Sequence, residues 1–529
     1  MSDCRKVAAS TAEFHRPAVG GAAGLLAAVL VVACGGGSDL PAPSANDGDN
    51  SRLQRQAIAN PAQALWSAPV DLGFVPAAAA NVSNGTGEGA GRVLLWSAEN
   101  RFTFSSMGQT SPGVPTWTAL FDPVTGTATA PRAQAAGHNM FCPGTTNLPD
   151  GRLLVSGGST SRVTSIYNPA TDGWAQAGGT VMNIPRAYQA NTLLRDGSVL
   201  TLGGSWNGGV GGKDGEVWTE GSGWRRLTGV PVTPFQTADS GGPYRSDNHM
   251  WLFPTGNGRV LHAGPSANMN WISPAGNGLV TPAGRRADDA DAMQGSAVMF
   301  EPGRILVTGG AREYVASPAT ASAFVIDARA ELSVRRIPGM AFTRVFHNGV
   351  VLPSGEVLVI GGKDRSDAFN DDGARLIPEV WNPGTETFTR MPAMSVPRTY
   401  HGVAILMPDA RVLVAGSGLC GCAADQPRAQ VLTPHYLLND DGTPALRPRI
   451  TSAPAQTEFG GAMSVTTNSA VASFVLIRLS SVTHTVNNDQ RRIPLTIRSV
   501  SGTSYVLDAP TNPGTVSYTH LTLPTILRV

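Results

Sequence analysis

The stretch DGRLLVSGG (150–158) decides the architecture of this 529-residue chain, because close copies of it recur along the sequence. Each copy reads as a turn, a buried strand and a sharp bend at glycine. The other copies are DGSVLTLGG (196–204), NGRVLHAG (257–264), PGRILVTGG (302–310), SGEVLVIGG (354–362), DARVLVAGSG (409–418) and a degenerate first one, GRVLLWSAEN (91–100). Their spacing, from about 46 to about 62 residues, is close to the kelch period. The repeat predicts a seven-bladed kelch-type β-propeller over residues 61–432.

Composition agrees with an all-β fold. The chain contains 62 glycines and 39 prolines but only 15% charged residues, which favours short strands and tight turns over long helices. Basic and acidic residues number 39 and 38, so there is no positive excess for binding nucleic acid. Only three lysines occur, Lys6, Lys213 and Lys363. We interpret this scarcity as an effect of genomic base composition and not as a functional feature.

Equivalent positions of the repeat are expected to form a ring around one mouth of the central channel. Counting back 15 residues from the start of each glycine pair gives Cys142, Tyr188, Asn248, Gln294, Phe346 and Tyr400. Three of these positions share the contexts PRAYQ, TRVFH and PRTYH. Singly, such aromatic residues more often pack between blades, and His401 is more often a hydrogen-bonded core histidine. A lone cysteine on the blade next to a tyrosine, facing a second tyrosine and a histidine, is an unusual combination.

Residues 433–515 predict a small immunoglobulin-like β-sandwich, because SFVLIRLSS (473–481) and RIPLTIRSV (492–500) read as strands. Between them, the loop VTHTVNNDQRR (482–492) carries His484 and is long enough to reach the propeller axis. Cys420 and Cys422 are close enough to pair in an oxidising compartment.

The N-terminus reads as an export signal. A basic start is followed by an uncharged stretch, residues 18–33, that is too short for a comfortable membrane span. VVAC (31–34) resembles a bacterial lipobox, in which Cys34 is lipidated; ordinary cleavage nearby is the alternative. We expect residues 1–34 to be the signal and 35–60 a disordered linker. The protein is then a cell-envelope lipoprotein of the periplasm or outer membrane, bound to membrane only through Cys34, or it is secreted.

Six motifs together resemble the galactose oxidase family of mononuclear copper radical oxidases. They are MFCPG (140–144), PRAYQ with GGSW (185–206), YRSDNH (244–249), PRTYH (397–401), GLCG (418–421) and THTVNNDQRRIPL (483–495). The resemblance covers about residues 61–510. It implies a copper cofactor with Tyr188, Tyr400, His401 and His484 as ligands. It further implies a thioether bond from Cys142 to the Tyr188 ring, carrying a tyrosyl radical, with Trp206 stacked over the pair.

The chemistry of these residues agrees with that implication. Two imidazoles and two phenolic oxygens suit tetragonal Cu(II) better than zinc or magnesium. Alcohol oxidation removes two electrons whereas one copper cycles by one, so a second one-electron store is required. A thioether on the phenol of Tyr188 lowers its oxidation potential, and Trp206 shields the radical from water. Tyr400 then acts as general base, Tyr188 abstracts hydrogen, and dioxygen leaves as hydrogen peroxide.

The resemblance also implies a substrate pocket in which an arginine and aromatic walls suit a polyhydroxylated ring. Its members are Arg245, Phe104, Tyr314, Phe346 and Phe369. Two glutamines of the family align with Gly241 and Val315, which implies weaker discrimination among sugars. The expected activity is oxidation of a primary alcohol, a galactose-type sugar or similar, by a monomer that uses dioxygen.

Two alternative functions remain open. One keeps the copper radical but oxidises a small aldehyde, as glyoxal oxidases do. The other is a non-catalytic kelch module that binds a protein or glycan at the cell surface. From Val516 onward the sequence departs from the family pattern, so residues 516–529 are interpreted as a non-native tail.

Overall fold

The computed structural model describes residues 60–83, 91–105, 114–134, 136–177, 181–454, 457–478 and 480–511. The expected signal (1–34) with its lipidation site Cys34, the linker (35–60) except Asn60, and the tail (516–529) lie outside these residues. In the described part of the chain, no helix is both long and apolar enough to cross a membrane.

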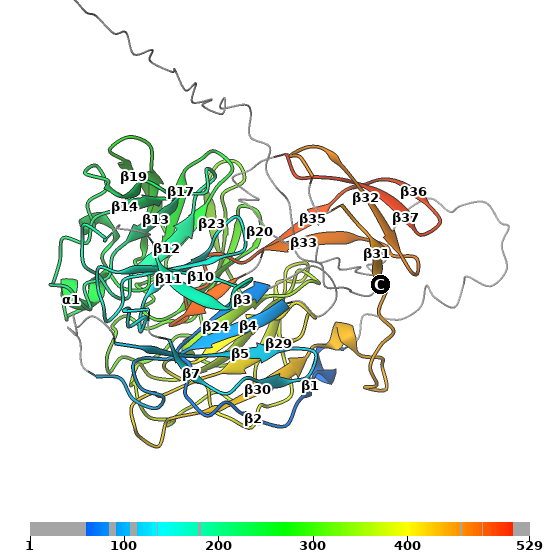
Figure 1. Ribbon diagram of the computed structural model, residues 1–529, viewed down its shortest axis with the longest axis horizontal. Coiled ribbons are helices and arrows are strands. Elements are labelled where there is room, and N and C mark those ends of the chain that lie inside the picture. The colour runs from blue at the N-terminus through cyan, green and yellow to red at the C-terminus, as the bar shows by residue number, and fades with distance from the viewer. Residues whose placement is uncertain are drawn as a thin grey trace, which may run out of the picture.

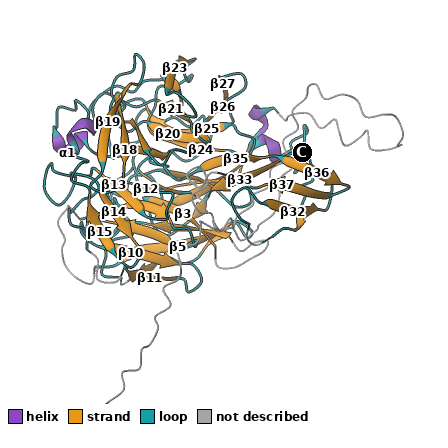
Figure 2. Ribbon diagram, turned by 90° about the horizontal axis from the view of Figure 1, so that it is seen from above, coloured by secondary structure: helices purple, strands orange, loops and turns teal. Residues whose placement is uncertain are grey.

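The body consists almost wholly of strands, as Figures 1 and 2 show, and this confirms the all-β expectation. Seven antiparallel sheets are the seven predicted blades, and an eighth sheet lies beside them in the C-terminal part. The helical segments among the described residues are short: α1 (Pro243–Ser246) and the 3-10 turns η2 (Pro61–Gln63), η3 (Thr233–Phe235) and η4 (His435–Leu437).

Each blade is a meander of neighbouring strands. Blade 1 holds β3 (Ala78–Ser83), β4 (Gly91–Trp96), β5 (Thr116–Asp122), β6 (Thr127–Ala128) and β7 (Arg132–Gln134). Blade 2 holds β8 (Gly144–Asn147), β9 (Leu153–Ser156), β10 (Thr164–Asn168) and β11 (Gly173–Gln176). Blade 3 holds β12 (Ala190–Leu193), β13 (Val199–Leu202), β14 (Glu216–Thr219) and β15 (Gly223–Arg226). Blade 4 holds β16 (Trp251–Pro254), β17 (Val260–Gly264), β18 (Asn268–Ser273) and β19 (Leu279–Arg285).

The remaining blades follow the same order. Blade 5 holds β20 (Ser296–Glu301), β21 (Arg304–Thr308), β22 (Ala323–Asp327) and β23 (Ser333–Ile337). Blade 6 holds β24 (Val345–Val351), β25 (Val357–Lys363), β26 (Glu379–Asn382) and β27 (Thr387–Arg390). Blade 7 holds β28 (Val403–Leu406), β29 (Val412–Ala415) and β30 (Arg428–Thr433). Two N-terminal strands, β1 (Leu65–Trp66) and β2 (Val70–Asp71), pair with β30 and so close the ring between the two ends of the propeller.

Buried arginines stabilise the glycine bends at the end of the second strand of a blade. In three blades, an arginine two residues before the shared aromatic position donates to the carbonyl of the first bend glycine. The pairs are Arg186 with Gly203 (2.9 Å), Arg344 with Gly361 (2.8 Å) and Arg398 with Gly416 (2.8 Å). Gly203 has φ +78°, and a Cβ there would lie 2.1 Å from the carbonyl oxygen of Asp247, so only glycine fits. The arginine that PRAYQ, TRVFH and PRTYH share therefore stabilises the glycine bend of its own blade.

The ring of repeat-equivalent residues is present, with a correction in two blades. Six residues placed 15 positions before the first bend glycine share a left-handed backbone: Cys142 (φ 60°), Tyr188 (67°), His249 (56°), Gln294 (56°), Phe346 (59°) and His401 (67°). The expectation of Asn248 and Tyr400 is wrong by one residue. It took the alanine before the bend as the first glycine position, whereas the bends lie at Gly264 and Gly416.

The C-terminal part forms the predicted sandwich. One sheet contains β31 (Ile450–Ser452), β32 (Ala462–Thr467), β36 (Ile497–Ser501) and β37 (Ser504–Asp508). It packs on β33 (Phe474–Arg478) and β35 (Arg491–Leu495) through an apolar core that includes Phe474, Leu476, Ile493 and Leu507. β35 also pairs in parallel with β20, so the sandwich and blade 5 share one sheet (Figure 1).

The loop between β33 and β35 enters the centre of the propeller. Every residue from Ser480 to Arg491 except Val486 is buried, although the segment reads SSVTHTVNNDQR. Its strand β34 (Ser481–Thr483) pairs with β3 at the inner edge of blade 1. We call residues 480–491 the central plug.

Side chains of the central plug bond to the innermost strands of four blades. Asn488 donates to the Asn191 carbonyl in β12 at 3.2 Å and accepts from the Leu252 amide in β16 at 3.2 Å. Gln490 bonds to both the amide and the carbonyl of Val351 in β24, each at 2.9 Å. Polar side chains thus replace the strand partners that these inner edges lack, which meets the requirement that buried polar groups be paired.

Asp489 anchors the plug to blade 2. Its carboxylate accepts from the Thr146 hydroxyl at 2.7 Å and from the Asn147 amide at 3.1 Å, and it pairs with buried Arg478 at 3.3 Å. The Thr146 hydroxyl, the Asn147 amide and the Arg478 guanidinium thus all interact with one buried carboxylate.

We expect Asp489→Ala to lower the free energy of unfolding by about 3–5 kcal/mol, because it removes the buried carboxylate that pairs with Arg478 and accepts from Thr146 and Asn147. Urea unfolding followed by tryptophan fluorescence measures this loss. Asp508→Ala is the control, since the Asp508–Arg498 pair is exposed and should contribute at most about 1 kcal/mol. Equal losses in the two variants would contradict the anchoring role.

Candidate copper and redox site

The five side chains predicted for the redox site meet at the centre of the propeller. Cys142 and Tyr188 lie just before β8 and β12, Tyr400 and His401 just before β28, and His484 directly after β34. Each of the five is at most 4% exposed. The structure therefore brings together residues from three blades and the central plug.

Backbone geometry aims these side chains inward. Cys142, Tyr188, His401 and His484 have φ values of 60°, 67°, 67° and 49°, a region that residues other than glycine rarely adopt. Neighbouring blades also bond directly at this level: the Tyr188 amide donates to the Cys142 carbonyl, and the His249 amide to the Tyr188 carbonyl, both at 2.9 Å. These bonds hold the unusual conformation in place.

Atoms of the kinds that bind metals lie close together. Cys142 Sγ and one nitrogen of each of His401 and His484 lie within 4.8 Å of one another. Cys142 Sγ is 3.5 Å from His484 Nε2. The hydroxyls of Tyr188 and Tyr400 are hydrogen-bonded to each other. Ring centroids are 4.0 Å apart for Tyr400 and His401, and 4.7 Å for Tyr188 and His484.

Each imidazole is oriented by a bond from its outer nitrogen. His401 Nδ1 lies 2.6 Å from the Gly418 carbonyl, and its buried Nε2 has no hydrogen-bond partner among the described residues. His484 Nδ1 lies 2.6 Å from the Thr483 hydroxyl, which leaves Nε2 facing the site. An oriented imidazole with a free inner nitrogen is the usual arrangement of a metal ligand.

Burial sets the protonation states. It lowers the pKa of His401 to about 3 and that of His484 well below its usual value, so both rings are neutral, the form that binds metals. Burial, followed by the acidic neighbours Cys142 and Tyr314, raises the pKa of the Tyr188 and Tyr400 phenols. Burial also raises the pKa of the Cys142 thiol. A bound cation would be needed to keep the phenols deprotonated.

The donor set fits copper. Two neutral imidazoles and two phenol oxygens, with no carboxylate among them, suit Cu(II) better than Zn²⁺ or Mg²⁺. The unpartnered His401 Nε2 is an orphaned buried atom that such an ion would satisfy. A second metal-like cluster, Cys420, Cys422 and Asp425, has its two sulfurs joined in a disulfide, so no thiolates are available there.

Trp206 covers Tyr188. The ring centroids are 4.7 Å apart with an interplanar angle of 46°, so the indole lies over the phenol at a tilt. Tyr244 stacks on Trp206 at 5.0 Å and 20°. The aromatic cover expected over the cysteine–tyrosine pair is present, but it is not parallel to the Tyr188 ring.

Two predicted pocket residues line the approach to the site. Phe104 and Phe369 lie beside His401, with centroid distances of 6.0 and 5.8 Å, and Phe369 is 5.3 Å from Tyr400. Phe369 is 38% exposed, so it reaches the surface while touching the site. The rings of Phe104 and Phe369 thus form an apolar wall beside His401.

The other predicted pocket residues take different positions. Phe346 is buried and packs edge-on against Tyr400 at 5.1 Å. Tyr314 is also buried, and its hydroxyl lies 2.9 Å from that of Tyr400. Arg245 is half-buried in α1, and its guanidinium makes no hydrogen bond or ion pair with the described residues. Its guanidinium donors are therefore available to a ligand.

Comparison with known proteins agrees with this geometry. Residues 292–420 match the family model "Glyoxal oxidase N-terminus", and residues 447–523 match "Galactose oxidase-like, Early set domain". The chain is 40% identical over 467 residues to a galactose oxidase of Gibberella zeae, and the aligned region covers 86% of this chain and 67% of that protein. The chain belongs to the galactose oxidase family.

Further relatives show the range of this family. A solved structure described as a novel fungal alcohol oxidase of the AA5 family, in complex with copper, matches with a TM-score of 0.80 and 34% identity, covering 86% of this chain and 95% of that chain. An aldehyde oxidase of Vitis pseudoreticulata is 27% identical over 388 residues, 66% of this chain and 71% of that protein. The proteins similar to this chain are thus named for alcohol oxidation and for aldehyde oxidation.

The sequence interpretation missed His249. This buried histidine lies 4.5 Å from Tyr188 and stacks on His484 at 5.2 Å between centroids. Its Nε2 is 3.2 Å from the Tyr314 hydroxyl, so a chain of polar contacts runs from His249 through Tyr314 to Tyr400. Counting the repeat back from Gly264 would have found it, since His249 holds the same position in blade 4 as Tyr188 in blade 3.

The cysteines divide as the sequence suggested. Cys420 and Cys422 form a disulfide, which leaves Cys142 as the free cysteine of the described residues. The amide of Gly421, inside the disulfide loop, donates to the Phe102 carbonyl at 2.9 Å. This loop therefore braces the segment that carries Phe104.

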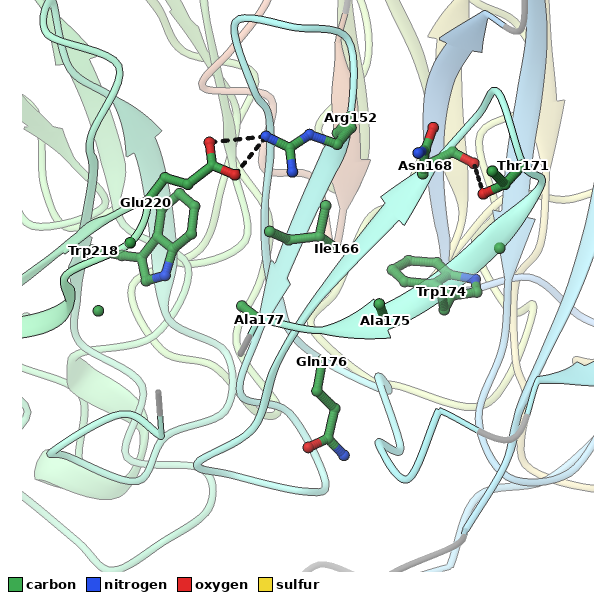
Figure 3. A pocket seen from close by; sticks show the side chains of 13 residues that line it. Arg152, Ile166, Asn168, Thr171, Trp174, Ala175, Gln176, Ala177, Trp218 and Glu220 are labelled. Carbon is green, nitrogen blue, oxygen red and sulfur yellow. Dashed lines mark hydrogen bonds and ion pairs between the residues drawn. The ribbon is translucent and has the colours of Figure 1, made fainter. Parts of the chain in front are cut away.

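A groove of about 550 Å³ lies apart from the site, where blades 2 and 3 meet at their outer strands (Figure 3). Trp174 and Trp218 line it together with the ion pair Arg152–Glu220 (2.7 Å). None of the predicted site residues faces this groove. The functional residues gather at the centre instead.

Proposed function

We propose that this protein is a copper radical oxidase that converts a primary alcohol to the aldehyde while reducing dioxygen to hydrogen peroxide. The observation that carries the proposal is the convergence of a free cysteine, two phenols and two neutral imidazoles in one buried space. Its relatedness to a galactose oxidase and to a copper-bound alcohol oxidase supports the same activity.

Tyr188, Tyr400, His401 and His484 would hold the copper. Copper, when bound, supplies a one-electron redox couple and a Lewis acid. Gly418 and Thr483 keep the two imidazoles aimed at it through their Nδ1 atoms. Burial excludes water, so opposite charges at the site attract one another strongly.

Cys142 and Tyr188 supply the second electron store. Cys142 and Tyr188 already lie in one buried cluster in the unmodified protein. Cross-linking forms one S–C bond, breaks the S–H bond and one ring C–H bond, and passes two protons and two electrons to dioxygen, giving hydrogen peroxide. The thioether then donates electron density to the phenol and makes its one-electron oxidation easier. Trp206 covers the modified ring.

Tyr400 and Tyr188 have different roles in oxidising the alcohol. Tyr400 takes the hydroxyl proton at its phenol oxygen, while the oxidised Tyr188 takes a hydrogen atom from the adjacent carbon. The Tyr314 hydroxyl, 2.9 Å from Tyr400, donates to that oxygen when it is anionic. The alcohol loses two electrons and two protons in total, and dioxygen receives both.

A non-catalytic kelch module explains this centre poorly. Binding modules present their side chains to a partner, whereas these five are buried. The buried Nε2 of His401 has no hydrogen-bond partner among the described residues, which is costly unless a bound group compensates. Oxidation of small aldehydes is the nearer alternative, and the match to the glyoxal oxidase family model favours it as a side activity. A hydrated aldehyde offers the same C–H and O–H bonds as an alcohol.

The substrate we favour is a primary alcohol with an apolar tail. Phe369, which contacts the site, is 38% exposed, and Val315, which follows the buried Tyr314 and stands where the resemblance expects glutamine, is 45% exposed. Gly241 stands at the second such position, and a side chain there would meet Arg245 Cδ at 2.6 Å. Arg245 is therefore the polar anchor that we propose for the hydroxyl end of the substrate. A hexose would leave several hydroxyls without partners.

Export from the cytoplasm, with Cys34 as lipid anchor, remains part of the proposal. The Cys420–Cys422 disulfide supports an oxidising compartment. The balanced charge of the chain supports a soluble small molecule and dioxygen as its partners, with no nucleic acid. We also propose that the enzyme works as a monomer.

Copper loading in air should link Cys142 to Tyr188. After reduction of the Cys420–Cys422 disulfide, mass spectrometry should show a loss of about 2 Da and a joined pair of peptides. Cys142→Ser should abolish the link and lower alcohol turnover at least about a hundredfold while copper stays bound, since sulfur is not a proposed ligand. The matched control, Cys420→Ser with Cys422→Ser, should keep the link. Full turnover by Cys142→Ser would exclude the radical mechanism.

Substrate preference follows from the apolar mouth. With copper-loaded protein, peroxide release should show kcat/KM for benzyl alcohol at least about tenfold above that for galactose. Val315→Gln should narrow this ratio by adding a polar partner at the mouth. Val124→Gln, an exposed valine in the β5–β6 turn, is the control and should leave the ratio unchanged. A preference for galactose in the unaltered protein would refute the apolar assignment.

A further inference from the structure

Both lysines in the described part of the chain are buried, at 1% exposure each, in a protein that otherwise uses arginine for its positive charge. They are Lys213 and Lys363. Neither forms a direct ion pair with a described carboxylate, although Asp247 acts on Lys213, and four aspartates of its own loop, Asp364, Asp367, Asp371 and Asp372, act on Lys363 from farther away. A buried ammonium without such a partner is costly, so its contacts call for an explanation.

Lys213 closes the loop that carries Trp206. Its Nζ donates to the carbonyls of Pro185 (2.5 Å), Asn207 (3.1 Å) and Gly208 (2.9 Å). Asn207 and Gly208 directly follow Trp206, and Pro185 lies three residues before Tyr188. One ammonium therefore ties the indole loop to the strand entry that places the cysteine-linked tyrosine.

Lys363 closes the loop that carries Phe369 in the same way. Its Nζ donates to the carbonyls of Asp367 (2.9 Å) and Asn370 (3.2 Å) and to Asn370 Oδ1 (2.5 Å). Phe369 lies between these two residues. The two loops are equivalent in topology, since each joins the second and third strands of its blade: β13 to β14, and β25 to β26.

The chemistry of the two contacts explains the residue type. An ammonium has three N–H groups that radiate from one atom, and each lysine meets three oxygen acceptors. Burial lowers the pKa of Lys213 to about 8 and also lowers that of Lys363, which reports the cost of desolvation. The planar fork of arginine cannot direct its donors at three oxygens around one point.

We propose that Lys213 and Lys363 are positioning residues of this oxidase, each holding one aromatic side chain of the site: Trp206 over the Tyr188 ring, and Phe369 at the substrate mouth. The roles given to Trp206 and Phe369 rest on the proposed function, whereas the lysine hydrogen bonds that close the two loops do not. Both lysines of the described residues thus lie where a single nitrogen meets three oxygen acceptors.

The test uses Lys213→Met and Lys363→Met, which keep a long unbranched side chain but remove the charge and the donors. Arg286→Met is the matched control. Arg286 is a buried cation in blade 4 that donates to the carbonyls of Ala263 and Ser266 at 2.8 and 2.9 Å and also pairs with Asp289 at 2.6 Å. The control therefore removes a buried cation, with at least as large a loss of contacts, without touching either loop.

Hydrogen exchange of the copper-free proteins tests the closure itself. We expect exchange of residues 205–213 to rise about tenfold in Lys213→Met only, and exchange of residues 364–373 to rise about tenfold in Lys363→Met only. Unchanged exchange in both loops would overturn the proposal, whether or not the protein oxidises alcohols.

The copper-loaded proteins test the two roles. Lys213→Met should shorten the lifetime of the oxidised cofactor, followed by its visible absorption, with KM unchanged. Lys363→Met should raise KM for benzyl alcohol about tenfold with kcat nearly unchanged and the lifetime preserved. If Lys213→Met, Lys363→Met and Arg286→Met changed the cofactor lifetime and KM equally, the lysines would only stabilise the fold in general. That result would overturn the positioning role. If the unaltered protein forms no oxidised cofactor, the proposed function fails, and the exchange experiment still decides the loop closure.

Discussion

The structure depends on the burial of a polar segment, Ser480–Arg491, inside the propeller. A buried segment rich in amides and charges is stable only when its donors and acceptors find partners. Here the side chains of Asn488, Asp489 and Gln490 bond to the inner strands of four blades. The same segment carries His484, so the contacts that stabilise the closed propeller also deliver a metal ligand to its centre. Stability and site assembly are therefore linked through one loop.

A one-residue difference between blades explains how two adjacent residues enter the site. The spacing from the buried arginine to the bend glycine is 17 residues for Arg186–Gly203 and Arg344–Gly361 but 18 for Arg398–Gly416. The extra residue lies between Arg398 and His401, where the Gly402 amide bonds to the Thr399 carbonyl at 2.9 Å. Tyr400 and His401 therefore both face the centre.

Much of the fold was predictable because the glycine-pair repeat is a local signal. The same count brought Cys142 and Tyr188 to neighbouring blades. It failed at His249, where the second glycine of the pair is replaced by Pro265 and the starting point of the count is ambiguous. It also could not reveal which blades Asn488, Asp489 and Gln490 contact, because those bonds join segments more than 130 residues apart. The roles of Lys213 and Lys363 were invisible for a related reason: composition counts residues and does not show which oxygens surround them.

The central claim is that one copper ion binds where the plug meets the ring of blades, beside a cysteine joined to a tyrosine. Diffraction from copper-soaked crystals at the copper absorption edge tests it most directly. We expect one strong anomalous peak bounded by Tyr188, Tyr400, His401 and His484, with continuous electron density from Cys142 Sγ to the Tyr188 ring. A peak at the Cys420–Cys422 loop instead, or a filled central site with separate Cys142 and Tyr188 side chains after aerobic loading, would contradict it.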